Sequence, residues 1–320
     1  MGKPQFEQSI FKNPTGMQKY VSTSLQQPHR ARQALRDAHE KRIPPLLGCY
    51  LGLSSIPTMR YIAPMGFDMV WIDWEHTACD VETMTSMVHD TMFMSYGKTI
   101  PFVRVPGHDH AIIGYALDAG ASIVVPQVDT VEQAKHIIEA AKFGTTPTRR
   151  GTRSVPPFRL TMGYGDVPID SSVDIWHNWN DQAAVIIQIE SLEGIHNLDA
   201  ILTEVPEIDA VWLGSIDARV SMNLRAGLGL PTDEPEWLAA YDVFMKTMKK
   251  HDKPLAGWSL GTPEQALVDG DDKCFMIMWG DVVEYAKMGA GLAHMKGLFT
   301  ESRKAQGLPV EGEPATNGSS

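Results

Sequence analysis

Titratable side chains that could transfer protons follow a hydrophobic segment, F-D-M-V-W-I-D-W-E-H (67–76). Asp73, Glu75 and His76 stand at its end. Crowding ionisable groups beside apolar residues costs desolvation free energy, so this position is a candidate site. Asp73 precedes His76 by three residues, and a carboxylate that orients an imidazole raises its basicity. We expect Asp73 and His76 to form an acid/base dyad; the alternative is a polar His76 on a loop.

Two further acids could bind a hard divalent cation. Glu190 follows Gln188 in Q-I-E, and Asp217 ends L-G-S-I-D. Carboxylate oxygens suit Mg²⁺, Mn²⁺ and Co²⁺, and water or substrate oxygens could complete an octahedron. Alternatively, each acid pairs with an arginine or caps a helix. Arg104, in V-R-V, is either a structural ion-pair partner or a cation that stabilises an enolate oxygen.

Short apolar segments that alternate with helical patterns must position these groups. The expected strands are residues 45–50, 67–73, 100–105, 122–128, 184–190, 208–214, 253–258 and 273–279. Helical patterns cover residues 81–92, 130–142 and 235–250, the second with Asp129 or Thr130 as its cap. Alternation of this kind is typical of a parallel sheet, and eight repeats predict a closed (β/α)₈ barrel. A doubly wound open sheet is the alternative, although no G-x-G-x-x-G follows the first strand.

The polar residues lie where a barrel would need them. Active sites of (β/α)₈ barrels occupy the carboxyl ends of the strands. Arg104 is near the end of the third expected strand and Gln127 near the end of the fourth. Side chains alternate along a strand, so Gln188 and Glu190 share the face that points into the barrel mouth.

Composition limits the possible partners and the location. The chain has 320 residues, a net charge of -11 and three cysteines without a C-x-x-C pair. Acidic charge argues against nucleic acid and anionic membrane as partners, and the cysteines favour a reducing compartment. No apolar run is long enough for a membrane span. We therefore expect a cytoplasmic protein that binds a small molecule and copies of itself.

The chain is expected to form one domain with extensions. Residues 1–28 are an N-terminal extension, residues 29–305 the catalytic barrel, and residues 306–320 a flexible C-terminal tail. Residues 144–182, with G-T-T-P-T-R-R-G-T-R and V-P-P-F-R, are expected to form a long irregular excursion. Long loops inside compact domains are often functional.

Several segments together resemble the HpcH/HpaI family of metal-dependent class II pyruvate aldolases. The motifs run in order from about residue 30 to about residue 300: F-D-M-V-W-I-D-W-E-H, V-R-V-P, L-D-A-G-A-S-I-V-V-P-Q-V-D-T-V-E-Q-A, Q-I-E-S-L-E-G-I-H-N-L-D-A-I and I-D-A-V-W-L-G-S-I-D-A-R-V-S-M. The resemblance implies a barrel of the phosphoenolpyruvate/pyruvate type. The long excursion and extended termini are more similar to the branch of the fungal enzyme macrophomate synthase than to compact bacterial members.

The resemblance also implies roles for individual residues. Glu190 and Asp217 match the metal ligands, with Mg²⁺ expected and Mn²⁺ or Co²⁺ compatible. Gln188 matches a residue that holds the 2-oxo acid, and Arg104 one that stabilises its enolate. His76 and Asp73 match the acid/base dyad, and the peptide groups of Gly214 and Ser215 match the turn that binds the substrate carboxylate.

The chain departs from the family pattern at two turns of the pocket. Thr77 stands where the family has Gly after Glu-His, and Ser215-Ile216 replaces Pro-x before the acidic residue. These changes alter backbone freedom, so we expect an acceptor substrate different from the bacterial one.

Three hypotheses about function follow. The first is an aldolase that cleaves a 4-hydroxy-2-oxo acid, or decarboxylates oxaloacetate, through a pyruvate enolate. The second is a biosynthetic enzyme, similar to macrophomate synthase, that joins an oxaloacetate-derived enolate to a larger acceptor. The third is a metabolite-binding barrel without catalysis. The resemblance further implies a homo-oligomer, either a trimer or a hexamer.

Overall fold

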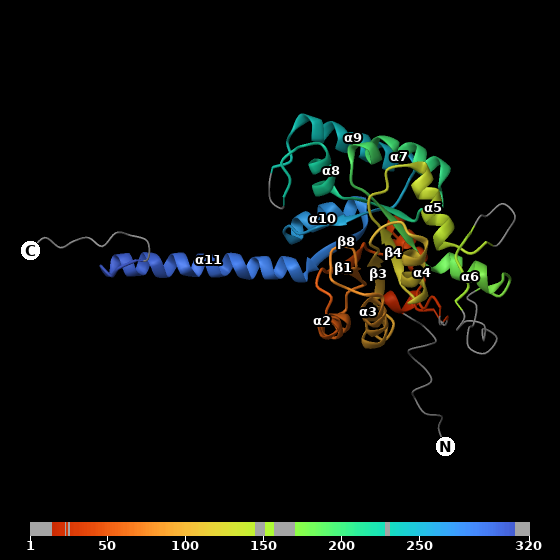
Figure 1. The fold of residues 1–320 in the computed structure, drawn as a ribbon, viewed down its shortest axis with the longest axis horizontal. Coiled ribbons are helices and arrows are strands. Elements are labelled where there is room, and N and C mark those ends of the chain that lie inside the picture. Colours follow the sequence, from red (N-terminus) through yellow and green to blue (C-terminus); the bar gives the residue numbers. More distant parts are fainter. Residues whose placement is uncertain are drawn as a thin grey trace, which may run out of the picture.

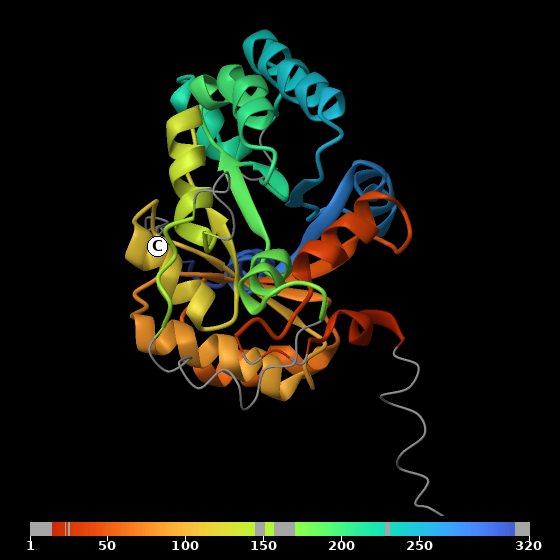
Figure 2. The same cartoon turned by 90° about the vertical axis from the view of Figure 1, so that its right-hand side faces the viewer.

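A closed barrel of parallel strands forms the centre of the molecule (Figures 1 and 2). The computed structural model describes residues 15–22, 24, 26–144, 151–156, 170–227 and 231–310. Within them, eight strands pair in sequence order, and β8 closes onto β1. The strands are β1 (Leu46–Leu51), β2 (Met69–Asp73), β3 (Ile100–Arg104), β4 (Ser122–Val125), β5 (Val185–Ile189), β6 (Ala210–Leu213), β7 (Leu255–Trp258) and β8 (Lys273–Gly280). The eight predicted strands and the barrel are confirmed.

Helices lie between successive strands along the chain, with one more helix before β1 and one more after β8. They are α1 (Ala31–His39), α2 (Ile56–Ile62), α3 (Val81–Met94), α4 (His110–Asp118), α5 (Val131–Ala141), α6 (Ile175–Gln182), α7 (Leu192–Glu204), α8 (Ser215–Ser221), α9 (Pro235–Lys250), α10 (Pro263–Asp272) and α11 (Asp281–Ala305), with the 3₁₀ turns η2 (Gly16–Tyr20) and η3 (Ala63–Met65). The helical patterns predicted for three segments are confirmed as α3, α5 and α9. Thr130 caps α5 in a capping box with Gln133.

Two apolar clusters follow from the alternation of side chains along the strands. One lies between the strands and the surrounding helices and includes Val70, Ile72 and Val103. The other includes Trp71 and Phe102, the neighbours of those residues in sequence, and it fills the barrel interior. Because residues two apart share a face, Asp73 and Arg104 continue the inner rows of Trp71 and Phe102 toward the carboxyl ends of the strands.

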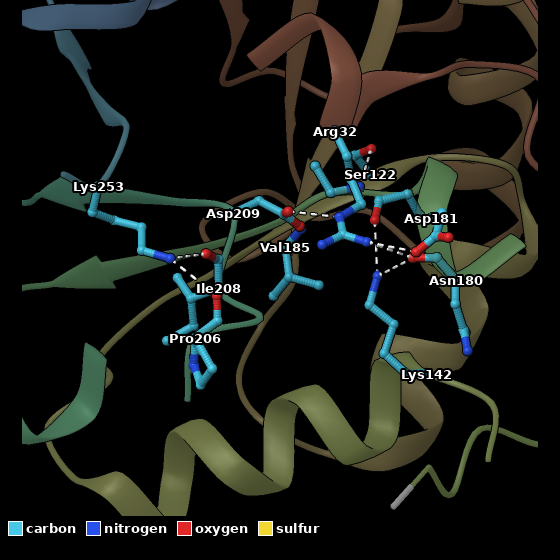
Figure 3. A network of polar contacts seen from close by, with 12 residues as sticks. Arg32, Ser122, Lys142, Asn180, Asp181, Val185, Pro206, Ile208, Asp209 and Lys253 are labelled. Atoms are coloured by element: carbon cyan, nitrogen blue, oxygen red, sulfur yellow. Dashed lines mark hydrogen bonds and ion pairs between the residues drawn. The ribbon is translucent and has the colours of Figure 1, made fainter. Parts of the chain in front are cut away.

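A buried polar network closes the opposite end of the barrel (Figure 3). Arg32 of α1 donates from Nε to Asp209, which precedes β6, and from Nη1 to Asp181. The other carboxylate oxygen of Asp209 accepts from the backbone N–H of Val185, the first residue of β5. Lys142 Nζ donates to the carbonyl oxygens of Asn180 and Ala183. This network ties α1 to the amino ends of β5 and β6 and leaves the carboxyl ends for the site.

Helix α11 departs from the regular barrel pattern. It begins at the end of β8 and extends away from the barrel instead of folding back onto it (Figure 1). None of its residues is buried. At its first residue, Asp281 accepts hydrogen bonds from the backbone N–H groups of Gly52 and Leu53, in the loop that follows β1. The root of α11 is therefore fixed to the barrel, whereas its length is exposed.

Parts of the predicted excursion and of the two ends fall outside the residues that the structure describes. Residues 145–150 and 157–169 of the predicted excursion lie outside the described residues, as do residues 1–14 and 311–320 of the two ends. The described end of the excursion is not irregular, since α6 forms there with Asp174 as its N-cap. Among the described residues, no helix is both long and apolar enough to cross a membrane.

Candidate active site

Asp73 and Arg104 form the most tightly bonded pair at the barrel mouth. They are direct neighbours in the register between β2 and β3. Arg104 donates from Nε to Asp73 Oδ1 at 2.9 Å and from Nη2 to Oδ2 at 2.6 Å. Its Nε also lies 3.2 Å from Glu75 Oε2, and its guanidinium stands over the Trp71 ring. Arg104 is therefore held from one edge by a carboxylate and from below by an indole.

Asp73 and Arg104 each favour the charged form of the other. Burial raises the pKa of Asp73, but the hydrogen bonds and charge of Arg104 outweigh burial and hold that pKa below its usual range. Burial also raises the pKa of Glu75, and Arg104 and His76 only partly oppose the increase. Asp73 is thus an ionised structural partner of Arg104.

His76 does not pair with Asp73, and this corrects the expected dyad. Its ring is exposed, and its Nε2 atom lies 3.6 Å from Glu75 Oε2. The physical reason is the strand register, because Arg104 from β3 stands beside Asp73 and occupies both carboxylate oxygens. A histidine three residues beyond Asp73 has already left the strand. The carboxylate available to His76 is that of Glu75.

Glu190 lies buried at the end of β5, 4% exposed, between three neighbours. Its Oε1 atom accepts from Gln188 Nε2 at 3.0 Å, and its Oε2 atom accepts from the Gln127 backbone N–H at 3.0 Å. Gly214 allows the turn after β6 to pass close by, since a Cβ there would stand 2.6 Å from Glu190 Cγ. The carboxylate is therefore fixed in position.

The electrostatics of Glu190 indicate which groups face it. Burial raises its pKa to about 7, the Gln127 N–H opposes this, and the charge of Asp217 adds to it. Arg104 and Glu75 also act on it, with opposite signs. The groups from β2, β3, β5 and α8 thus surround one region of the barrel mouth. An acid that burial and a second acid keep partly protonated is suited to receive a cation in place of the proton.

The remaining predicted residues lie on the turn after β6. Asp217 is exposed in the first turn of α8, and Ser215 is exposed at its first residue. Gly214 is buried immediately before them. In the part of the chain that the structure describes, no three His, Cys, Asp or Glu side chains gather closely enough to hold a metal ion. Two carboxylates, Glu190 and Asp217, fit a divalent cation whose other ligands are water and substrate oxygens.

One side chain at the mouth still lacks a partner for a buried atom. Gln188 is 2% exposed and donates to Glu190, but its Oε1 atom has no hydrogen-bond partner among the described residues. A buried polar atom without a partner is costly, and a ligand or water that donates to it would remove the cost. The position agrees with a role for Gln188 in holding a substrate.

Sequence reasoning missed Tyr50 and assigned no role to the backbone of Gln127. Tyr50 OH donates to Asp73 Oδ2 at 2.5 Å from the end of β1. Tyr50 is the last residue of the expected strand 45–50, and this position could have indicated that its side chain lies at the barrel mouth. Gln127 has a positive φ of 55°, which turns its N–H toward Glu190. No sequence pattern indicates such a backbone conformation for glutamine.

The fold and site define a (β/α)₈-barrel protein with a carboxylate and arginine centre at the carboxyl ends of its strands. The family model "HpcH/HpaI aldolase/citrate lyase" matches residues 46–250. The chain belongs to this family.

The chain is also similar to proteins of known name. Hydroxypyruvate/pyruvate aldolase of Roseobacter denitrificans is 31% identical over 182 residues, 55% of this chain and 65% of that protein, so the match falls just short of two thirds of its length. 5-keto-4-deoxy-D-glucarate aldolase of Klebsiella pneumoniae is 29% identical over 71% of this chain and 80% of its own. The structure of macrophomate synthase aligns with a TM-score of 0.79 at 27% identity, covering 94% of this chain and 99% of the other.

Proposed function

We propose that the protein is a divalent-metal-dependent carbon–carbon lyase that forms a pyruvate enolate from a 2-oxo acid. The observation that carries this proposal is the arrangement around Glu190, in which two acids and Arg104 act on one buried carboxylate. The family of this chain and its similarity to a relative named hydroxypyruvate/pyruvate aldolase support the reaction class. Substrates would be a 4-hydroxy-2-oxo acid, cleaved to pyruvate and an aldehyde, or oxaloacetate, which loses carbon dioxide.

Glu190 and Asp217 would hold the cation. Bound there, Mg²⁺, Mn²⁺ or Co²⁺ would supply Lewis-acid chemistry and orient the 2-oxo acid. Gln188 would hold the substrate through its unpartnered carbonyl oxygen or its amide, and the peptide groups of Gly214 and Ser215 would bind the substrate carboxylate. The protein thus contributes two anionic ligands and a set of neutral contacts.

Arg104 would stabilise the charge that develops during cleavage. The bond between C3 and C4 breaks, and its electron pair forms the enolate, with negative charge on the former keto oxygen. A guanidinium stays protonated at all relevant pH values, so it can donate to that oxygen without losing its own charge. Glu75 and Asp73 hold the guanidinium at the mouth.

His76 would move the remaining proton in the aldol reaction. As C3–C4 breaks, the C4 hydroxyl loses its proton and becomes the aldehyde carbonyl, and the enolate gains a proton at C3. The exposed His76 ring can accept the hydroxyl proton, and its Nε2 atom lies 3.6 Å from Oε2 of Glu75. This assignment keeps His76 as the base and replaces Asp73 with Glu75 as its partner.

The experiment that tests the function is pyruvate release from oxaloacetate, before and after EDTA, with add-back of Mg²⁺, Mn²⁺ and Co²⁺. Metal-restored release that Glu190→Gln abolishes supports the proposal. Release that EDTA does not affect, or full activity in Glu190→Gln, would contradict the metal assignment. No release in folded protein favours the third hypothesis, a barrel that only binds metabolites.

A biosynthetic role is the second candidate. The structure of macrophomate synthase aligns over 94% of this chain and 99% of its own, with 27% identity. Under this proposal the enolate from oxaloacetate would add to a larger acceptor rather than be protonated. Oxaloacetate consumption in which pyruvate accounts for only part of the product, once candidate acceptors are added, would favour it.

The exposed helix α11 supports assembly with a second copy. Its large apolar residues recur at alternating spacings of three and four: Tyr285, Met288, Leu292, Met295 and Phe299. Such spacing places them on one face of the helix. Three interior glycines, at 289, 291 and 297, each weaken an isolated helix by roughly 1 kcal/mol. A helix of this composition needs a partner surface.

The same chain carries a surface that fits it. Between α10 and the outer faces of β8 and β1, a groove of about 920 Å³ remains where the eighth helix of a regular barrel would pack. Its apolar lining includes Leu47, Leu267, Met278 and Trp279. Two copies that place α11 in each other's groove bury both surfaces in an isologous contact. Such pairs favour the expected hexamer over the trimer, because a trimer leaves one copy unpaired.

A further inference from the structure

The proposed function assigns no role to Tyr50, which lies at the barrel mouth. It lies near the end of β1 and is the neighbour of Trp71 in the register between β1 and β2. Its hydroxyl reaches Asp73, one inward position further along β2 than Trp71. The contact therefore links β1 to the pair formed by β2 and β3.

Asp73 receives four hydrogen bonds, and Tyr50 supplies one of them. Oδ1 accepts from Arg104 Nε and from the backbone N–H of Glu75, and Oδ2 accepts from Arg104 Nη2 and Tyr50 OH. With two donors on each oxygen, the plane of the carboxylate is fixed from three strands or loops. A carboxylate in a fixed plane also fixes the plane of a guanidinium bonded to it side-on.

This arrangement leaves one edge of Arg104 available. Nε and Nη2 face Asp73, whereas Nη1 has no hydrogen-bond partner in the described part of the chain. The Nη1 and Nη2 groups together present a second pair of N–H donors in the guanidinium plane. Their direction depends on the orientation of Asp73.

Packing holds the Tyr50 ring in place. It contacts Trp258 edge-on, with ring centroids 5.2 Å apart, and lies 6.3 Å from Trp71. A Cβ at Gly52 would stand 2.6 Å from Tyr50 Cε1, and one at Gly280 would stand 3.2 Å from its Cβ. Two glycines thus make room for the ring. Burial and the charge of Asp73 raise the pKa of Tyr50, so its hydroxyl remains a donor.

We propose that Tyr50 is a positioning residue, whose hydroxyl fixes Asp73 so that Asp73 aims the free edge of Arg104 at the reacting oxygen of the substrate. The inference rests on the proposed function. A second carboxylate competes with Asp73 for the guanidinium of Arg104, because Glu75 Oε2 lies 3.2 Å from Arg104 Nε. Without the Tyr50 hydroxyl, Asp73 can turn and Arg104 shifts toward Glu75, which withdraws that carboxylate from His76.

The first test follows Arg104 itself and requires no substrate. Tyr50→Phe keeps the ring and its contacts and removes only the hydroxyl. The Arg104 Nε–H resonance is identified by its loss in Arg104→Lys, and its hydrogen exchange with water is measured in wild type and Tyr50→Phe. Because the hydroxyl helps to hold the acceptor of that N–H, we expect exchange to accelerate about tenfold, the scale of one hydrogen bond to a charged group. Unchanged exchange would overturn the inference.

The second test is a double-mutant cycle on oxaloacetate turnover. Tyr50→Phe should lower kcat about tenfold with a smaller change in KM, since the enolate oxygen carries full charge only along the reaction. In Arg104→Lys protein, which lacks the aimed edge, Tyr50→Phe should have little further effect. Equal effects of Tyr50→Phe in both backgrounds would mean that Tyr50 does not act through Arg104.

A matched variant separates a general loss of structure from the specific effect. Tyr61→Phe removes the hydroxyl of an exposed tyrosine of α2 and should leave both the exchange rate and kcat unchanged. The two tests also separate the two proposals. If wild-type protein releases no pyruvate with any metal but the Arg104 Nε–H still responds to Tyr50→Phe, the proposed function fails and the positioning of Arg104 by Tyr50 stands.

Discussion

Gly214 lies against Glu190 so closely that the smallest side chain at 214 would collide with the carboxylate: its Cβ would be 2.6 Å from Cγ and 2.9 Å from Cδ. Glu190 cannot retreat easily, because Gln188 and the Gln127 N–H hold both of its oxygens. The turn after β6 can therefore lie this close to the end of β5 only because residue 214 has no Cβ.

Gly214→Ala should therefore displace Glu190 and weaken cation binding. We expect the metal concentration for half-maximal oxaloacetate turnover to rise at least about tenfold, the scale of a perturbed ligand environment. The measurement is a Mn²⁺ titration of activity in EDTA-treated protein. Gly114→Ala, in α4, where an added Cβ would meet no atom within 4 Å, is the control and should leave the titration unchanged. An unaltered titration in Gly214→Ala would separate Glu190 from the metal.

Replacing Arg104 should remove transition-state stabilisation. Arg104→Ala should lower kcat/KM by about 10²- to 10³-fold, equivalent to roughly 3 to 4 kcal/mol, as for loss of an oxyanion donor. Arg104→Lys should recover only part of this, because one ammonium cannot bond Asp73 side-on and a substrate oxygen together. Steady-state kinetics on oxaloacetate measures both. Activity in Arg104→Ala within threefold of wild type would exclude the proposed role.

Buried His29 predicts sensitivity to acid. Burial lowers the pKa of this imidazole to about 4, whereas in the unfolded chain it is near the ordinary value of 6.5. The neutral ring therefore contributes stability above pH 6.5, and this contribution is lost as pH falls toward 4. The scale is about 3 kcal/mol for a fully buried ring.

Urea unfolding at pH 7.5 and pH 4.5 measures this contribution. The fall in the free energy of unfolding should be smaller in His29→Gln than in wild type. His294→Gln, which changes an exposed histidine of α11, should retain the wild-type fall. An identical pH response in wild type and His29→Gln would show that acid acts elsewhere.

Arg32 is expected to matter for stability rather than for activity. Its side chain and that of Asp209 are 9% and 6% exposed, so Arg32→Met leaves a buried carboxylate without its cation. The expected loss in the free energy of unfolding is about 3 to 5 kcal/mol. Adding Asp209→Asn removes the stranded charge while an oxygen remains for the Val185 N–H, and should recover part of the loss. Urea unfolding of both variants measures this recovery. If the double variant recovers nothing, the lost ion pair is not the cause of the lower free energy of unfolding.

Charge on the apolar face of α11 should dissociate the protein. Leu292→Glu places a carboxylate within the stripe that we expect to lie in a partner's groove, and sedimentation velocity should show smaller species. Ala290→Glu adds the same charge on the opposite face of the same helix and should not change the distribution. If both variants sediment like the wild type, α11 does not lie in the groove of a second copy.

The barrel could be predicted because each strand carries its own signal. Apolar segments such as residues 184–190 are bounded by polar turns. Where such segments alternate with helices, the usual result is a parallel sheet covered by those helices. The neighbourhood of Gln188 and Glu190 also follows from the alternation within one strand. Their hydrogen bond could thus be anticipated locally, since Gln188 lies on β5 and Glu190 directly follows its last residue.

The partner of Asp73 could not be predicted in this way. Whether Arg104 or His76 reaches Asp73 depends on the register between β2 and β3, which hydrophobic patterns leave open to within a residue or two. Tyr50 was missed for the same reason, because its contact crosses from β1 to β2. The direction of α11 follows from packing between whole surfaces, and no local sequence pattern distinguishes a helix that folds back from one that extends outward.

Under the assembly that we propose, the first residue of α11 links the contact between copies to the candidate active site. Asp281 holds the loop after β1, and two residues before that loop begins stands Tyr50. The helix that we propose to dock in another copy therefore anchors, through Asp281, the loop next to Tyr50. Under the proposed assembly, dilution below the dissociation constant of the pair should lower the activity per mole of enzyme before it lowers the content of folded protein.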